Sequence, residues 1–315
     1  VVVEGSPRLG WVMESPENGT RQSAYEIDIR EAFTGRSVWN SGKVYSSQSQ
    51  LVSTKGADIR PDNSFNYSWR VRVWDETDTP SEWSSEAKFR AVPERLSSGQ
   101  WIGAITRQNA HLPEGRKFHG GELKKPEVKA LWAAVDTLAK KSICLRKDFI
   151  AEKQLEEAVA YVCGLGHYEF SLNGKKVGDG EFTPLWSDYE KTVYYNVYDV
   201  TSLLNQGGNA IGILLGNGFY NVQGGRYRKL QISFGAPTLF FKLIMKYTDG
   251  TQKEVLSGAD WKYSLSPITF NCIYGGEDYD ARLEQKGWNM PGFDDTAWRP
   301  VVVQRVPKGE LCPQQ

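Results

Sequence analysis

The sequence predicts an all-β protein built from two β-sandwich domains, and three observations lead to this fold class. In residues 65–74 the side chains of Tyr67, Trp69 and Val71 alternate with polar ones, as in a strand with one buried and one solvated face. Asn173-Gly174, the pair favoured in a type I′ hairpin turn, separates two further strand-like runs. The 31 Gly, 11 Trp, 15 Tyr and 13 Phe match the composition of β-sandwiches, which are rich in turns and rings.

Length and charge narrow the domain organisation and the possible partners. A chain of 315 residues exceeds the size at which one hydrophobic core stops growing, about 250–300 residues, so two domains are expected. The 38 basic and 38 acidic residues cancel, which gives no electrostatic reason to expect a nucleic acid or an anionic membrane as partner. No apolar run approaches the roughly 20 residues that cross a bilayer, so membrane insertion is not expected.

The first domain is expected over residues 1–94. Its strand candidates, separated by turn residues, are residues 9–11, 24–29, 37–44, 65–74 and 81–89. The pattern YxWRVRVWD, a turn and then SxWSxxxxF resembles a fibronectin type III domain, which would place seven strands in a sandwich of about 90 residues. Trp39, Trp74 and Trp83 are expected to pack in the core, with a ligand surface as the alternative.

The second domain is expected over residues 95–305. Strands are predicted at residues 101–105, 142–149, 168–172, 193–198, 210–215, 239–247 and 252–256. Residues 107–125, which contain His111 and His119, read as a solvated loop. Apolar side chains then recur at helical spacing and predict one amphipathic helix that ends near residue 140: Val128, Leu131, Trp132, Val135 and Leu138. Helix-favouring composition around residues 153–158 conflicts with an alternating pattern, and we predict strand from Glu157 because sheet context overrides propensity.

Residues 161–220 carry the most specific pattern in the chain. They contain GLGHYEFSLNGKKVGD, then PLWSDYEKTVYYNVYDVTSLL, then GGNAIGILLGNGFY. Together with IYGGEDYDAR at residues 273–282 and FDDTAW at residues 293–298, these blocks resemble the N-terminal β-sandwich domain of bacterial α-L-rhamnosidases. The resemblance implies a jelly-roll or galactose-binding-like sandwich for the second domain.

The resemblance also implies what the chain does. Its parent would be a bacterial glycoside hydrolase that removes terminal rhamnose with inversion, and a rhamnose-containing glycan would be a partner. In that family the general acid and base lie in an (α/α) helical barrel that follows the β domains, and no long run of paired helices occurs here. We therefore expect no catalytic residue in this chain, and we expect residues 306–315 to be a connector to the barrel. The compartment stays open, with the bacterial periplasm or exterior favoured over the cytoplasm.

Three loop clusters contain the side chains that hold a pyranose, namely rings for its apolar face and charged or amide groups for its hydroxyls. The candidate carbohydrate-binding residues are Asp179, Glu181, Trp186 and Tyr189 in the first cluster, Asn217, Tyr220 and Arg226 in the second, and Glu277, Asp278, Asp280 and Arg282 in the third. The alternative is that these residues cap turns, form structural ion pairs or dock another domain. Glu277 with Asp278 or Asp280 could also form a glycosidase-type carboxylate pair, which the resemblance argues against.

Metal and cofactor motifs are weak. Cys144, Cys163, Cys272 and Cys312 are widely spaced, so buried free thiols are expected, with one disulfide as the alternative. No cofactor is expected; the alternative is Ca²⁺ bound by carboxylate and carbonyl oxygens. Three functions stay open: an accessory region of a rhamnosidase, a stand-alone carbohydrate-binding module, and a structural spacer or interaction domain.

Overall fold

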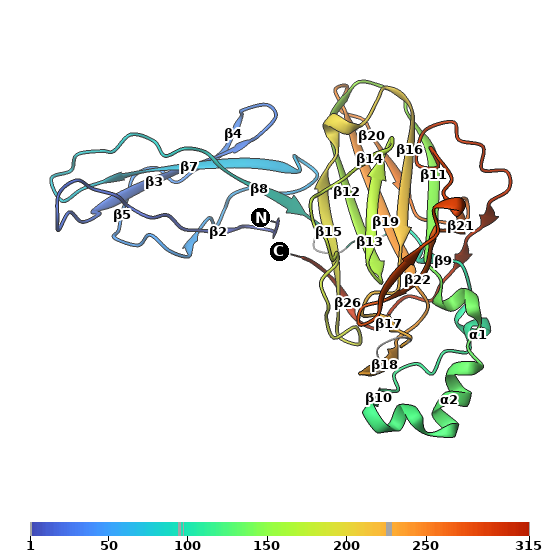
Figure 1. The fold of residues 1–315 in the computed structure, drawn as a ribbon. Coiled ribbons are helices and arrows are strands. Elements are labelled where there is room, and N and C mark those ends of the chain that lie inside the picture. The colour runs from blue at the N-terminus through green and yellow to red at the C-terminus, as the bar shows by residue number, and fades with distance from the viewer. Residues whose placement is uncertain (1, 94–95, 97, 225–228, 315) are drawn as a thin grey trace. The chain divides into compact units, whose positions relative to one another are not determined.

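The structure is a computed structural model that describes residues 2–93, 96, 98–224 and 229–314. Contacts between residues divide the chain into two units, Val1–Leu96 and Ser97–Gln314. Both units are built mainly from strands (Figure 1), which confirms the all-β prediction.

The first unit is a sandwich of short and medium strands. Its strands are β1 (Val2–Glu4), β2 (Arg8–Leu9), β3 (Ala24–Glu31), β4 (Ser37–Asn40), β5 (Val44–Tyr45), β6 (Val52–Ser53), β7 (Asn66–Trp74) and β8 (Ala87–Val92). The main sheet has the order β1-β8-β7-β3-β4, with β5 also on β3, and β2 pairs with β6. The core includes Ile27, Ile29 and Phe89, and the rings of Tyr67 and Phe89 stack at 5.5 Å.

One face of β7 differs from the prediction. Tyr67 and Val71 lie in the core as expected, but the opposite face is not freely solvated. The Trp83 ring lies 4.5 Å from the Arg70 guanidinium and 4.8 Å from that of Arg72, so the three side chains cover one another. Residues 81–86, which were predicted to begin a strand, are not part of one, and β8 begins only at Ala87.

The second unit contains two large sheets. The first has the order β14-β13-β16-β11-β21-β24 and the second β25-β9-β19-β12-β15-β26, with β20 also on β19. Their strands are β9 (Ile102–Gly103), β11 (Ile143–Ala151), β12 (Leu155–Leu165), β13 (Tyr168–Leu172), β14 (Lys175–Lys176), β15 (Thr192–Asp199), β16 (Gly207–Leu215), β19 (Thr238–Tyr247), β20 (Gln252–Leu256), β21 (Lys262–Leu265), β24 (Arg299–Pro300), β25 (Val302–Val303) and β26 (Glu310–Pro313). Smaller pairings involve β10 (Phe118–His119), β17 (Asn221–Val222), β18 (Leu230–Ser233), β22 (Ile268–Cys272) and β23 (Gly276–Tyr279).

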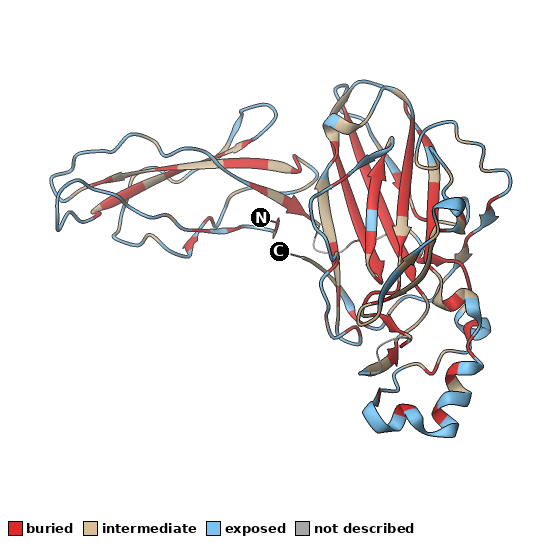
Figure 2. Ribbon diagram, in the orientation of Figure 1, coloured by how far each residue is buried: buried red, intermediate tan, exposed pale blue. Residues whose placement is uncertain are grey.

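The core of this unit lies between the two large sheets. Leu145 and Ile213 come from one sheet, and Val162 and Leu243 from the other. Trp261 is fully buried among them and packs 5.4 Å from the ring of Phe241. Figure 2 shows buried positions running along the central strands, as expected where both sheets contribute one face to a shared core.

The predicted hairpin at Asn173-Gly174 is confirmed. It joins β13 to β14, and both turn residues have positive φ, 52° for Asn173 and 78° for Gly174. A type I′ turn requires this conformation, which Asn and Gly adopt at low cost. A Cβ atom at Gly174 would also overlap the Met290 sulfur, so a larger residue at this position would clash unless Met290 moved.

The helical prediction was wrong in extent. The apolar pattern forms α2 (Pro126–Ala133) and a separate 3₁₀ turn, η2 (Thr137–Lys140). The Asp136 carboxylate accepts a hydrogen bond from the Leu138 amide at 2.8 Å and starts this second turn. The preceding residues are not a plain loop, since they form α1 (Arg107–Ala110), β10 and η1 (Gly120–Lys124). All these pieces share a small core around Trp132.

The remaining element predictions differ mostly at their ends. The strand predicted from Glu157 begins at Leu155, and Glu157 is only 3% exposed. A short 3₁₀ turn, η3 (Thr201–Leu203), follows β15, and a second one, η4 (Ala281–Leu283), follows β23. In residues 2–93, 96, 98–224 and 229–314, no helix is long and apolar enough to cross a membrane. Nor does the described part of the chain gather three or more His, Cys, Asp or Glu side chains around a possible metal position.

Candidate functional site

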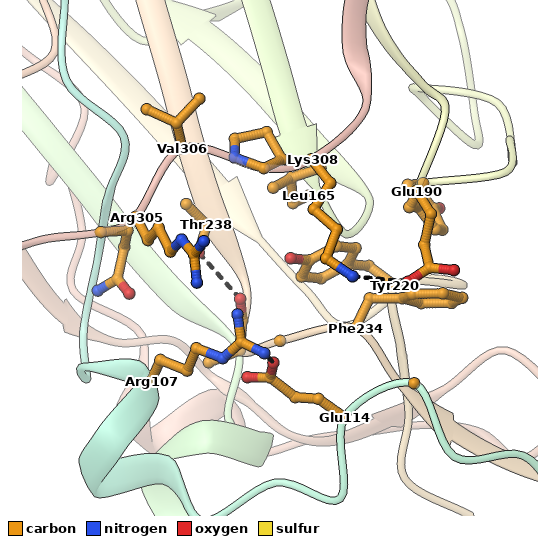
Figure 3. Close-up of a pocket in the computed structure, with 16 residues that line it drawn as sticks. Arg107, Glu114, Leu165, Glu190, Tyr220, Phe234, Thr238, Arg305, Val306 and Lys308 are labelled. Atoms are coloured by element: carbon orange, nitrogen blue, oxygen red, sulfur yellow. Dashed lines mark hydrogen bonds and ion pairs between the residues drawn. The ribbon is translucent and has the colours of Figure 1, made fainter.

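A cavity of about 170 Å³ opens at one end of the second unit, where six chain segments meet. Figure 3 shows its main lining side chains. They come from α1 and the loop after it, the end of β12, the loops before β15 and β17, the loop between β18 and β19, and residues 304–308. We call this cavity the charged pocket.

Five charged side chains are among the residues that line the charged pocket. Arg107 forms an ion pair with Glu114, and Lys308 forms one with Glu190 at 3.0 Å (Figure 3). Burial raises the pKa of Glu114 above its ordinary value, although the nearby positive charges of Arg107, Arg305 and Lys308 oppose that shift. The pocket therefore combines salt-bridged carboxylates with cationic side chains that stay largely exposed, 55% for Arg107 and 67% for Lys308.

Aromatic rings form the inner wall of the charged pocket. Tyr189 meets Tyr220 edge to face with ring centroids 5.1 Å apart, and Phe234 lies 6.0 Å from Tyr220 in a stacked arrangement. Burial raises the pKa of both tyrosines, so their phenols stay neutral at physiological pH. The prediction placed Tyr189 and Tyr220 in different loop clusters, and the structure brings them into contact.

A second feature is a group of rings that are partly open to solvent, which we call the aromatic ledge: His167, Phe182, Trp186 and Phe219. Trp186 is 65% exposed and stacks on Phe219 with centroids 5.4 Å apart. Phe182, 66% exposed, lies 5.6 Å from His167, which meets Phe219 edge to face. Burial lowers the pKa of His167, so its ring is neutral at pH 7.

Glycines explain why the ledge can form. Gly166 has φ of 114°, and a Cβ atom there would overlap the carbonyl oxygen of Gly216. This close approach lets the Gly216 amide donate a 2.8 Å hydrogen bond to the His167 carbonyl oxygen. The two glycine-containing loops thus place His167 beside Phe219.

The other described residues of the first two predicted clusters belong to neither the charged pocket nor the aromatic ledge. Asp179 and Glu181 are exposed. Asn217 is fully buried, where its amide donates to the Lys140 carbonyl oxygen at 2.8 Å and to Asn271 Oδ1 at 3.0 Å. It therefore holds loops together and does not present its side chain to a ligand from solvent. Arg226 lies outside the described residues.

The third predicted cluster does not line the charged pocket. Glu277 and Asp278 lie on β23, which pairs only with β22 in the described sheets. Asp280 caps η4 and forms a 2.6 Å ion pair with Arg282, whose side chain is 88% exposed. The geometry of Asp280 and Arg282 fits the alternative of a local turn with its own ion pair.

The sequence did not point to any of the five charged side chains that line the pocket: Arg107, Glu114, Glu190, Arg305 and Lys308. They are spread from residue 107 to residue 308 and belong to no local motif. The only sequence signal close to them is the density of rings around Tyr189 and Tyr220.

Comparison with known proteins identifies relatives of both units. Residues 153–315 match the family described as "Alpha-L-rhamnosidase N-terminal domain", and residues 1–92 match "Rha78A-like, N-terminal immunoglobulin domain". An α-L-rhamnosidase of Formosa agariphila is 36% identical over 93% of this chain and 31% of its own length. One from an Alteromonas species is 33% identical over 98% of this chain and 32% of its own length. The chain thus spans about a third of these curated relatives.

Solved structures agree with these matches. The α-L-rhamnosidase from Dictyoglumus thermophilum superposes with a TM-score of 0.78 at 30% identity, over 98% of this chain and 33% of that one. The Streptomyces avermitilis α-L-rhamnosidase, solved with L-rhamnose, gives a TM-score of 0.78 at 25% identity, over 97% of this chain and 43% of that one. Both similarities extend over both units of the chain.

Proposed function

This chain belongs to the family of α-L-rhamnosidase N-terminal domains, and we propose that it is the accessory, non-catalytic region of a larger α-L-rhamnosidase. In this role it supports a catalytic helical barrel that hydrolyses terminal rhamnose. The observation that carries the proposal is the match of both units to relatives named α-L-rhamnosidase, of which the chain spans about a third.

The charged pocket agrees with a non-catalytic role. An inverting glycosidase needs one carboxylic acid and one free carboxylate, separated by roughly 6.5–9.5 Å with room for a water molecule. Glu114 and Glu190 are instead each held by a cationic partner. An ion-paired carboxylate is a weaker base than a free one, so neither residue supplies the free carboxylate that this mechanism needs.

We further propose that the aromatic ledge contacts a rhamnose-containing glycan. L-rhamnose carries a methyl group and an apolar ring face, and both suit the exposed Trp186 ring. Because Trp186 already stacks on Phe219, its orientation is fixed before a ligand arrives and less entropy is lost on binding. A docking face for the catalytic barrel is the competing role, since Leu185 beside Trp186 is 55% exposed as well.

The test is an NMR or calorimetric titration of this chain with L-rhamnose, with and without Ca²⁺. Saturable binding that is lost in Trp186→Ala and kept in Phe33→Ala, an exposed ring of the first unit, would support glycan contact. No binding at millimolar sugar would refute it and favour the docking role. Hydrolysis of an aryl rhamnoside by the chain alone would contradict the non-catalytic assignment.

A further inference from the structure

The charged pocket carries one positive charge more than its own carboxylates neutralise. Arg107, Arg305 and Lys308 lie around two carboxylates, Glu114 and Glu190, among the described lining residues. The pairs Arg107–Glu114 and Lys308–Glu190 account for both carboxylates. Arg305 has neither a side-chain hydrogen bond nor an ion-pair partner within the part of the chain that the structure describes. Its guanidinium group is thus available to an anion.

The position of Arg305 directs this free charge toward the cavity. Figure 3 shows the cationic groups of Arg107, Arg305 and Lys308 around the same space. Arg305 also lies near enough to Glu114 to act electrostatically on its pKa. A carboxylate entering here would meet a planar donor that can bind it through two parallel hydrogen bonds.

The aromatic wall indicates that the ligand also has a ring with an apolar face. Tyr220 and Phe234 are stacked with an interplanar angle of 30°, and Tyr189 braces both from the side. In Figure 3 the Tyr220 and Phe234 rings lie beside Lys308 and Glu190, on the side away from Arg305. Tyr220 is buried and Phe234 is partly exposed, so a ligand ring would contact mainly Phe234. A small inorganic anion would contact the cations and leave that ring surface uncovered.

The size of the cavity limits the ligand. Its volume of about 170 Å³ is below the roughly 300–1,000 Å³ of sites for drug-sized molecules. One monosaccharide unit suits this space better than an oligosaccharide. A chain of sugars would therefore place a single residue in the pocket and leave the others outside.

From these features we infer that the charged pocket binds a hexuronate, the carboxylate-bearing sugar unit of an acidic glycan. Its carboxylate pairs with Arg305, and its ring lies mainly against Phe234. The choice of a sugar rests on the proposed function, whereas the binding of a ring-bearing anion rests on the pocket itself. This site is separate from the aromatic ledge, with which it shares no residue.

The test is a titration of the 315-residue chain with D-glucuronate and D-galacturonate, beside D-glucose, D-galactose and acetate. We expect a uronate to bind about tenfold or more tightly than its neutral parent sugar, because a charge-assisted hydrogen bond is lost in the latter. Acetate should bind much more weakly, since it lacks the ring. Equal binding of acetate and uronate would overturn the assignment to a sugar, and no uronate binding would overturn the site.

Variants separate this site from the ledge. Arg305→Gln should weaken uronate binding about tenfold or more, whereas Arg299→Gln, an exposed arginine on β24, should leave it unchanged. Arg305→Lys keeps the charge but not the planar donor pair, so its affinity for uronate should lie between those of the other two variants. Trp186→Ala should weaken L-rhamnose binding and leave uronate binding unchanged. The failure of one proposal can therefore be told apart from the failure of the other. Wild-type affinity in a folded Arg305→Gln protein would refute the inference.

Discussion

Arg146 Nε donates a 2.9 Å hydrogen bond to the carbonyl oxygen of Trp288, from a strand at the centre of a sheet to a loop far along the chain. Arg146 is only 1% exposed. Its guanidinium group also donates to the Met290 carbonyl oxygen at 3.2 Å and pairs with Asp295. The buried Arg146 guanidinium group therefore anchors the loop of residues 288–290, which leads into the FDDTAW motif at residues 293–298.

Replacing Arg146 with Met should destabilise the second unit strongly. The change leaves the Trp288 and Met290 carbonyl oxygens without this donor and Asp295 with Lys262 as its remaining ion-pair partner. Breaking a buried ion pair typically costs about 3–5 kcal/mol. Chemical denaturation followed by tryptophan fluorescence measures the loss. Arg282→Met removes an exposed ion pair and should leave the denaturation midpoint unchanged. A similar midpoint in both variants would show that Arg146 does not anchor the loop.

Asn217→Ala should reduce stability through a different mechanism. It removes one of two donors to the Lys140 carbonyl oxygen and one of two acceptors of Asn221 Nδ2, which lies 2.7 Å from Asn217 Oδ1. Each hydrogen bond lost typically contributes about 0.5–1.5 kcal/mol. Thermal unfolding should show a clear drop, whereas the exposed Asn18→Ala should behave as wild type. Unchanged stability together with lost sugar binding would instead support the ligand role predicted for Asn217.

Gly166→Ala should disrupt the aromatic ledge. The added Cβ would overlap the Gly216 carbonyl oxygen, and φ of 114° is unfavourable for alanine. We expect a lower melting temperature and altered NMR signals from His167 and Phe219. Gly121→Ala is the control, because its Cβ would meet no atom within 4 Å. Equal melting temperatures for the two variants would contradict the close contact between the loops.

Stability should fall on mild acidification because of His167. Burial between Phe182 and Phe219 lowers its folded-state pKa below the ordinary 6.5. Between the lowered value and 6.5 the unfolded chain binds more protons than the folded one, so acid favours unfolding. The contribution is complete above pH 6.5, is lost as the pH falls through that window and does not change further below it.

Melting temperatures between pH 7.5 and 5 test this expectation against a His167→Gln variant, whose curve should be flatter over that range. His111→Asn is the matched control, since His111 is exposed and Asn tolerates its φ of 51°. A His167→Gln curve parallel to wild type would place the acid sensitivity elsewhere.

The sequence predicted those elements whose cause is local. The Asn173-Gly174 hairpin depends on two adjacent residues that adopt positive φ, and it was predicted correctly. The long helix was predicted wrongly because Asp136 starts a new turn, which competes with the apolar periodicity on either side. The resemblance to rhamnosidases is confirmed by the family match over residues 153–315. It was visible in the sequence because its motifs are short, ordered blocks.

The pocket could not be predicted because its causes are tertiary. Arg107 and Lys308 reach one space only after the strands between them have paired. Trp186 is a candidate from the sequence because a ring stands among carboxylates in a loop; the structure shows it exposed, and its role in sugar binding stays a prediction. By contrast, Asn217 looked like a ligand residue, and its complete burial depends on Asn271 and Lys140, which are remote in sequence.

The pairing of β26 with β15 closes an edge of the second large sheet. Thr192, Val193 and Tyr194 lie in register with Glu310, Leu311 and Cys312 in a parallel arrangement. Without this short strand, β15 would offer unpaired amide and carbonyl groups flanked by β-branched and aromatic side chains, a template for association with other chains. Pro313, which lacks an amide proton, ends β26 and limits further pairing there. Residues 310–313 thus cover the edge of β15. Removing them would leave that edge open and should make the protein more prone to aggregation.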